Sequence, residues 1–299
     1  MEVLFRNVRE LVERAENENK LLSEIMIEQE MGMSERTREE IFTQMERNLE
    51  VMDQAIERGL KGVTSVTGLT GGDAVLMQKY IQSGKGLSGD FLLDAVSKAV
   101  ATNEVNAAMG MICATPTAGS AGVVPGVLFA VKNKLNPTHE QMVRFLFTAA
   151  AFGFVVANNA SISGAAGGCQ AEVGSAAAMA AASIVEMAGG TPQQSAHAFS
   201  ISLKNMLGLV CDPVAGLVEV PCVKRNAMGA ANAMVAADMA LAGIESRIPT
   251  DEVIDAMYRI GQTMPSALRE TAQGGLAATP TGPWLEKRIF GGAVANSGN

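Results

Sequence analysis

Apolar residues recur at steps of three and four along several segments of the chain, a spacing typical of amphipathic helices. Within the first 60 residues the pattern runs through Leu4, Val8, Leu11 and Ala15, and again through Ile41, Met45, Leu49, Met52 and Ile56. A further helical pattern runs from Asp90 to about Met109 and carries the polar residues Asn103, Glu104 and Asn106 near its end. Helices over 1–60 need a surface to pack against, and the buried polar positions need partners.

Breaks and start signals delimit the helices. Glycine, serine and threonine interrupt the pattern over 59–72 and 83–89, where we expect loops. Thr138 and Thr191 each begin a capping box, the second with proline at the first helical position. Thr250 is a third N-cap candidate.

The most apolar stretches, 149–157 and 176–185, are rich in alanine and too short for a membrane span. Alanine favours helices, and the chain has no strong run of alternating β-branched residues. The pattern therefore predicts an all-α fold in which these two stretches form buried helices.

Charge is spread very unevenly. Residues 1–60 hold 15 acidic and 8 basic side chains, whereas 149–210 hold only Glu172, Glu186 and Lys204. We expect a charged amphipathic helical segment over 1–60, an all-helical main domain over 61–290 and a flexible tail over 291–299.

The composition of the chain limits the classes of molecule that it is expected to bind. The 299 residues carry a net charge of −8 and only 4% aromatic residues, without a block of Lys or Arg, which argues against nucleic acid and an anionic membrane surface. The start of the chain has no signal- or transit-peptide pattern, so we expect a cytoplasmic protein with reduced cysteines. A small molecule or another protein is the expected partner.

Three segments carry candidate chemistry. The first, 113–122 (CATPTAGSAG), turns hydroxyls and backbone N–H groups toward one point, which suits a carboxylate or phosphate, although an interhelix turn gives the same pattern. The second, 158–169 (NNASISGAAGGC), is expected to be a buried segment whose backbone approaches a ligand or a crossing helix.

The third segment, 211–222 (CDPVAGLVEVPC), places two cysteines in a turn-rich stretch. Proline often accompanies cluster cysteines, but a free cysteine is more often a small buried apolar residue. No Cys-x-x-Cys or helical His pair indicates zinc, and the two histidines, His139 and His197, are expected to be surface or packing residues.

Together these motifs resemble the iron–sulfur-dependent L-serine dehydratases, and more narrowly the α subunit of their two-chain form. The resemblance rests on NNASISG, GGCQAEVG, CDPVAGLVEVPC followed by KRNA, ATPTAGSAG and RETAQGGLA, and it runs from about Gly59 to Gly275. It implies a lyase that converts L-serine to pyruvate and ammonia without pyridoxal phosphate, on a catalytic domain over 61–290.

The resemblance also implies a 4Fe-4S cluster held by Cys169, Cys211 and Cys222, while Cys113 matches no ligand position. Three protein ligands leave one iron open as a Lewis acid for loss of the β-hydroxyl.

We expect substrate contacts from nine positions around this cluster: Thr115, Thr117, Gly119, Ser120, Asn159, Ser161, Ser163, Lys224 and Arg225. Arg225 has the alternative of pairing with Asp212 or Glu219. The chain lacks the Ser-Ser-His-Thr string that single-chain relatives carry in an additional domain, so the general base stays unknown. The resemblance therefore implies a separate β subunit, which the charged N-terminal helices are expected to help dock.

Two other readings remain open at this point. The first is the same cluster chemistry on L-threonine or L-cysteine, since these substrates differ from serine by only a methyl group or a sulfur atom. A helical scaffold subunit whose thiols bind no cluster would share the composition.

Overall fold

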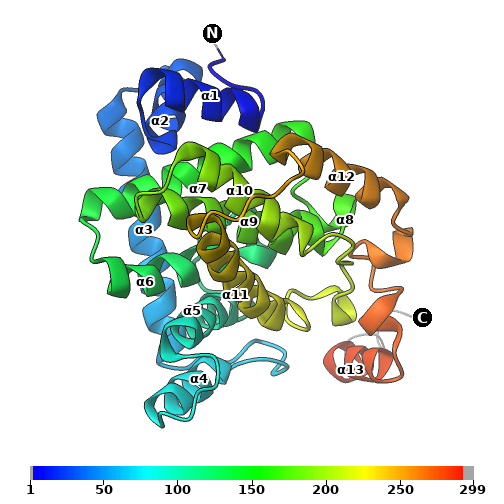
Figure 1. The fold of residues 1–299 in the computed structure, drawn as a ribbon. Coiled ribbons are helices and arrows are strands. Elements are labelled where there is room, and N and C mark those ends of the chain that lie inside the picture. The colour runs from blue at the N-terminus through cyan, green and yellow to red at the C-terminus, as the bar shows by residue number, and fades with distance from the viewer. Residues whose placement is uncertain (1–2, 292–299) are drawn as a thin grey trace.

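Thirteen α-helices, with short 3-10 and π turns between them, form the regular structure of residues 3–291 in this computed structural model (Figure 1). The helices are α1 (Val8–Glu18), α2 (Leu22–Ser34), α3 (Arg38–Leu60), α4 (Asp73–Gln82), α5 (Asp90–Ala107), α6 (Val123–Leu135), α7 (His139–Asn159), α8 (Gly164–Gly167), α9 (Ser175–Met187), α10 (Pro192–Lys204), α11 (Cys222–Leu241), α12 (Thr250–Thr263) and α13 (Thr281–Phe290). The predicted all-α fold is confirmed. Apart from Gly291, the tail expected over 291–299 lies outside the described residues.

Helix α9 forms the centre of the fold, in contact with α6, α7, α10 and α11 (Figure 1). Every residue from Ser175 to Val185 is buried, as predicted from the alanine-rich stretch. Small alanine side chains let the neighbouring helices approach closely, so the core is filled mainly by the larger side chains that those helices contribute.

Helix α7 is the second buried helix that the sequence predicted. By length and composition it would also be able to cross a membrane, but 61% of its most apolar window is buried inside the protein. Its buried side chains include Phe145, Phe152 and Val156. This burial is what a core helix shows.

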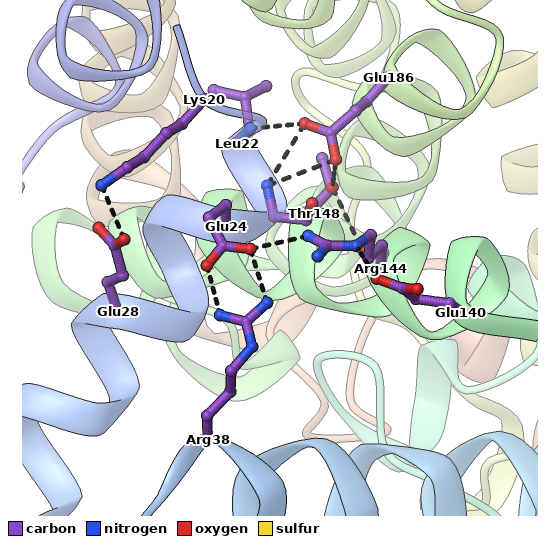
Figure 2. A network of polar contacts seen from close by, with 10 residues as sticks. Lys20, Leu22, Glu24, Glu28, Arg38, Glu140, Arg144, Thr148 and Glu186 are labelled. Carbon is purple, nitrogen blue, oxygen red and sulfur yellow. Dashed lines mark hydrogen bonds and ion pairs between the residues drawn. The ribbon is translucent and has the colours of Figure 1, made fainter. Parts of the chain in front are cut away.

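The three N-terminal helices pack against the rest of the chain through a network of charges (Figure 2). Glu24 of α2 accepts hydrogen bonds from Arg38 of α3 (Nη2, 2.8 Å) and from Arg144 of α7 (3.0 Å). Glu186 of α9 accepts from the Leu22 amide at 2.6 Å and from the Thr148 hydroxyl at 2.6 Å. Residues of 1–60 also share one continuous hydrophobic core with the later helices.

The capping boxes at Thr138 and Thr191 are confirmed, but the prediction that Thr250 is an N-cap is wrong. Pro249 occupies the cap, and Thr250 is the first helical residue, where its hydroxyl donates to the Ala196 carbonyl at 3.1 Å. The Thr250 side chain therefore makes a tertiary hydrogen bond to α10 instead of the local capping bond that the sequence predicted. Its neighbour Asp251 instead caps α1 by accepting from the Val8 amide at 2.8 Å.

The polar residues near the end of α5 have structural partners. Glu104 is buried and accepts from the amide of Asp73 at 2.7 Å, at the N-terminus of α4. Asn103 and Asn106 donate to the carbonyls of Gly119 (3.4 Å) and Ala118 (3.2 Å). These bonds attach α4 and the 113–122 loop to α5.

Candidate functional site

Three cysteines come from distant parts of the chain and converge beside α9. Cys169 precedes the π-helical turn Gln170–Gly174 that leads into α9, Cys211 lies in the loop after α10, and Cys222 is the first residue of α11. All three are buried. Besides burial, the charge of Cys169 raises the pKa of Cys211 and of Cys222, and the charge of Cys222 also raises the pKa of Cys211, so the three sulfurs lie near one another.

Backbone hydrogen bonds join the segments that carry Cys169 and Cys211. The Gln170 amide donates to the Leu209 carbonyl at 3.0 Å, and the Gln170 side chain accepts from the Gly208 amide at 2.9 Å. The Cys211 amide donates to Leu268 at 2.9 Å and its carbonyl accepts from the Glu270 amide at 2.7 Å. The loop around Cys211 is therefore held between the Cys169 turn and the segment after α12.

Burial is the main influence on all three thiols, and it raises each pKa. The pKa of Cys169 rises to about 11 and that of Cys222 to about 12, because a thiolate is poorly solvated there. The pKa of Cys211 rises furthest, since the charges of Glu172 and Cys169 act in the same direction as burial. Without a cation these thiols are neutral, and binding a metal ion would deprotonate them.

The carboxylate of Glu172 lies near the Cys211 sulfur. It accepts a hydrogen bond from the Thr117 hydroxyl at 2.8 Å, and its Oε2 lies 3.9 Å from the Cys211 sulfur. Burial raises the pKa of Glu172, and the charge of Glu270 raises it further. An acceptor of this kind orients the Thr117 hydroxyl and is sensitive to any cation that enters the site.

The loop before α6 faces Glu172. Ser120 donates to the Thr115 carbonyl at 3.0 Å, and Asn226 of α11 donates to the Gly119 carbonyl at 2.8 Å. A Cβ atom at Gly119 would lie 3.3 Å from both carboxylate oxygens of Glu172. The expected contact residues of this loop therefore border the cysteine cluster.

Two buried oxygens beside this loop have no hydrogen-bond partner within the described part of the chain, the Thr115 hydroxyl and the side-chain carbonyl of Asn103. Buried polar groups in native proteins are nearly always bonded, so such atoms call for an explanation. Groups left available in this way suit a bound polar molecule.

The second predicted segment divides into two parts. Asn158 and Asn159 are exposed at the end of α7, and the prediction of a wholly buried segment is wrong for them, because α7 reaches the surface there. The Asn159 side chain donates to the Arg6 carbonyl at 2.8 Å. Its expected role in substrate binding receives no support from this contact.

The later part of this segment does reach the cysteines. A Cβ atom at Gly164 would lie 2.7 Å from the Cys211 sulfur and 2.7 Å from Glu172 Oε2. Ser163 is the N-cap residue directly before it, and its amide donates to the Ser161 hydroxyl at 3.2 Å. Ser161 and Ser163 thus lie on the turn whose backbone passes closest to the cluster.

The two cations after Cys222 point in different directions. Lys224 is exposed and forms an ion pair with Asp73 at the start of α4. Arg225 is largely buried and forms an ion pair with Asp212 at 2.8 Å, the pairing that the sequence left as an alternative. The structure brings Arg225 to the cysteines and gives Lys224 a partner on α4.

The sequence analysis did not single out Glu172, Glu270 and Asn226 as site residues. Glu172 had one usable signal, since it is one of the few charged residues in a long apolar stretch. Glu270 lies in the RETAQGGLA motif, but nothing local indicated that this segment pairs with Cys211. Asn226 lies in the KRNA sequence, one turn after Cys222.

Comparison with known proteins gives a consistent result. A family model described as "Serine dehydratase alpha chain" matches residues 17–277. "Probable L-serine dehydratase, alpha chain" of Bacillus subtilis (strain 168) is 78% identical over 293 residues, which cover 98% of each chain. "L-serine dehydratase, alpha chain" of Peptoniphilus asaccharolyticus is 44% identical over 286 residues, covering 95% of this chain and 98% of that one.

A longer relative matches over only part of its length. "L-serine dehydratase TdcG" of Escherichia coli (strain K12) is 37% identical over 280 residues, which cover 91% of this chain and 61% of that protein. The remainder of that protein lies outside the match.

Proposed function

The chain belongs to the serine dehydratase alpha-chain family, and from that premise we propose that it carries the iron–sulfur half of an enzyme that deaminates L-serine. The observation that carries the proposal is the convergence of Cys169, Cys211 and Cys222 beside a loop of hydroxyl groups. The reaction eliminates water from serine and then takes up one water to hydrolyse the imine, so that serine yields pyruvate and ammonia.

The donor set fits a 4Fe-4S cluster better than a single ion. Within residues 3–291 no three His, Cys, Asp or Glu side chains are grouped closely enough to share one metal ion. An iron–sulfur cluster takes its protein ligands almost entirely as cysteine thiolates, and each binds a different iron. Three buried thiols, with the backbone of Gly164 passing close to one of them, meet that requirement.

When bound, such a cluster supplies a Lewis acid at the iron that has no protein ligand, which eases departure of the β-hydroxyl as hydroxide. The residues of the chain hold the serine against it. We assign the carboxylate of serine to the loop over Thr115, Thr117, Gly119 and Ser120, where the Thr115 hydroxyl has its proton available to donate. The unpartnered Thr115 hydroxyl supports this assignment.

Glu172 fixes the orientation of that loop. Its carboxylate accepts from Thr117, so the Thr117 hydroxyl proton is directed toward Glu172 and an oxygen lone pair is left for a donor on the substrate. Ser161 and Ser163 border the opposite side, next to Gly164. Loss of the α-proton and of the β-hydroxyl gives aminoacrylate, which tautomerises to an imine that water hydrolyses.

We place the general base on a separate β subunit. The relatives of matching length are named alpha chains, and the longer Escherichia coli protein carries additional sequence outside the match. Several charges of the N-terminal helices already have partners, as Glu24 has in Arg38 of α3 and in Arg144 of α7, which makes these charges poorer candidates for docking.

Exposed apolar side chains border the site and offer a better docking surface. Val66 (82% exposed) precedes Thr67, which donates to Glu219 in the loop between Cys211 and Cys222. Met109 (83%) and Met111 (64%) precede the Thr115 loop. Side chains of this kind are commonly covered in a complex, and this position would bring a partner to the mouth of the site.

The test is pyruvate release from L-serine by anaerobically reconstituted chain, alone and together with its β subunit, with L-threonine and L-cysteine as competing substrates. We expect pyruvate from serine only in the mixture. Faster product formation from threonine or cysteine than from serine would show that one of those amino acids is the substrate. Absence of elimination from all three amino acids would overturn the proposal.

A further inference from the structure

Arg225 occupies an unusual position among the charged residues of the chain. It lies in the first turn of α11, three residues after Cys222, and only 14% of its side chain is exposed. Its Nη1 donates to the Val210 carbonyl at 2.7 Å, directly before Cys211. Its Nη2 lies 2.8 Å from Asp212 Oδ1, directly after Cys211.

Asp212 is itself fixed by the segment after α12. Its second oxygen accepts from the Leu276 amide at 2.7 Å. Gly275 has a φ of +59°, and a Cβ there would lie 2.3 Å from Asp212 Oδ2, so only glycine lets the backbone approach this closely. The carboxylate is therefore already in place when Arg225 binds it.

The loop that Arg225 binds is also tied to the segment of Cys169. The Gln170 amide, directly after Cys169, donates to the Leu209 carbonyl at 3.0 Å, directly before Val210. Arg225 thus joins the Cys211 loop to α11, and that loop is in turn bonded to the turn that carries Cys169.

We propose that Arg225 is a positioning residue that holds the Cys211 loop against α11 and so fixes the three cysteines relative to one another for iron binding, rather than a substrate-binding residue. This inference rests on the proposed function, because it assumes that the three cysteines hold a cluster. The planar guanidinium reaches the Val210 carbonyl and the Asp212 carboxylate with different nitrogens, which a lysine ammonium cannot do with the same geometry.

The neighbouring Lys224 provides a matched control. It carries the same charge, comes from the same helical turn and is 62% exposed, with its ion pair on α4. Removing this charge changes the net charge of the chain equally, but leaves the cysteine segments untouched.

The experiment compares wild type with R225Q, R225K and K224Q, each reconstituted anaerobically with iron and sulfide. The rate at which a chelator removes iron is measured first. Changes in groups that support metal ligands lower metal affinity by about 10- to 100-fold, so we expect iron loss from R225Q to be at least about tenfold faster. K224Q should release iron at the wild-type rate, and R225K should lie between wild type and R225Q.

A second readout separates positioning from substrate binding. The visible absorbance and reduction potential of the cluster should change in R225Q and stay unchanged in K224Q, because both depend on the placement of the ligands and on nearby charge, and only Arg225 is bonded to the residues on either side of Cys211. In the complex with the β subunit, the KM for serine of R225K should match that of wild type while its iron is lost faster. A raised KM with wild-type iron retention and spectrum would overturn the inference.

D212N keeps Arg225 but removes the charge of its ion-pair partner. This variant tests the positioning role if R225Q does not fold. We expect faster iron loss from D212N as well, and retention like wild type would contradict the inference. If wild type takes up iron and both R225Q and D212N retain it as well as wild type does, the positioning role of Arg225 is refuted but the proposed function is not. Failure of wild type to take up iron would refute the proposed function itself.

Discussion

The interface of the N-terminal helices and the cysteine site are both rich in ionisable groups, yet the pKa values of Glu24 and Glu172 are shifted in opposite directions. At the interface two arginines surround Glu24, and the hydrogen bond from Arg38 is the main cause that lowers its pKa to about 2 (Figure 2). Burial raises the pKa of Glu186 at the same interface, but hydrogen bonds from Thr148 and from the amides of Leu22 and Ser23 oppose the rise. At the cysteine site burial and neighbouring negative groups raise the pKa of Glu172 and of the three thiols. The interface thus supplies its carboxylates with several donors from the chain, whereas the cysteine site gathers groups that a metal cation would stabilise.

This difference separates a region that stabilises the fold from one that supports chemistry. Changes at the interface should lower the free energy of unfolding, while matched changes at the cysteine site should lower turnover and leave the fold intact. Variants in the two regions separate these effects when turnover is measured in the complex with the proposed β subunit.

The largest effect is expected from Gly164→Ala. The new methyl group would lie 2.7 Å from both the Cys211 sulfur and Glu172, and the displacement it forces should lower turnover by about 10²-fold. Gly153→Ala is the matched control, since its Cβ would meet only the flexible end of Met179 at 2.9 Å. Steady-state kinetics and thermal unfolding of both variants test this, and equal turnover in the two would contradict it.

Glu186→Ala should act on stability instead. The change leaves the Leu22 amide and the Thr148 hydroxyl without their acceptor, which should lower the free energy of unfolding by about 2 kcal/mol. Urea unfolding at neutral pH measures the loss. Glu186→Gln, which keeps one carbonyl acceptor, should recover part of it, and a loss of turnover with unchanged stability would contradict the separation.

A pair of threonine variants compares the same bond in both regions. Thr117 donates to Glu172 at 2.8 Å and Thr148 donates to Glu186 at 2.6 Å. Thr117→Val should lower turnover by about tenfold, the equivalent of one lost hydrogen bond to a charged group. Thr148→Val should destabilise by about 1 kcal/mol with little change in turnover. The assignment fails if the two variants exchange these effects.

The smallest effect is a pH dependence at Glu24. Because its folded-state pKa is lowered from 4.5 to about 2, its ionised form stabilises the fold above pH 4.5, and this contribution is lost as pH falls toward 2. Glu24→Gln should therefore cost about 1 kcal/mol at pH 7, a modest value because Arg38 is partly exposed. The gap between wild type and variant should narrow steadily below pH 4.5 in urea unfolding, and a gap that widens would contradict the sign.

Local signals in the sequence were sufficient for the fold class and for several helix boundaries. The capping boxes at Thr138 and Thr191 combine a hydroxyl and an amide side chain three residues apart, and both form as predicted. Helix α2 gave no clear signal, because Ser23 and Gln29 are buried beside its apolar residues and obscure the periodicity. Thr250 is not a cap because its hydroxyl is already bonded to α10: it accepts a hydrogen bond from Ser200 and donates one to the Ala196 carbonyl.

The geometry of the candidate site was even less accessible from local sequence signals. The motifs identified the segments, and the resemblance supplied Cys169, Cys211 and Cys222 as ligands. Periodicity and spacing contain no information on which segments meet in space. The pairing of Cys211 with the segment at Arg269 and the hydrogen bond from Thr117 to Glu172 both join residues more than fifty positions apart, and only tertiary packing determines them.

The most direct test of the central claim is the iron and sulfide content of anaerobically reconstituted chain. We compare wild type with Cys113→Ser, Cys169→Ser, Cys211→Ser and Cys222→Ser. The account predicts about four irons and four sulfides per chain in wild type and in Cys113→Ser, and a large loss in each of the other three. Wild type that retains no iron, or single substitutions at Cys169, Cys211 and Cys222 that retain it fully, would contradict the claim that these three cysteines form the metal centre.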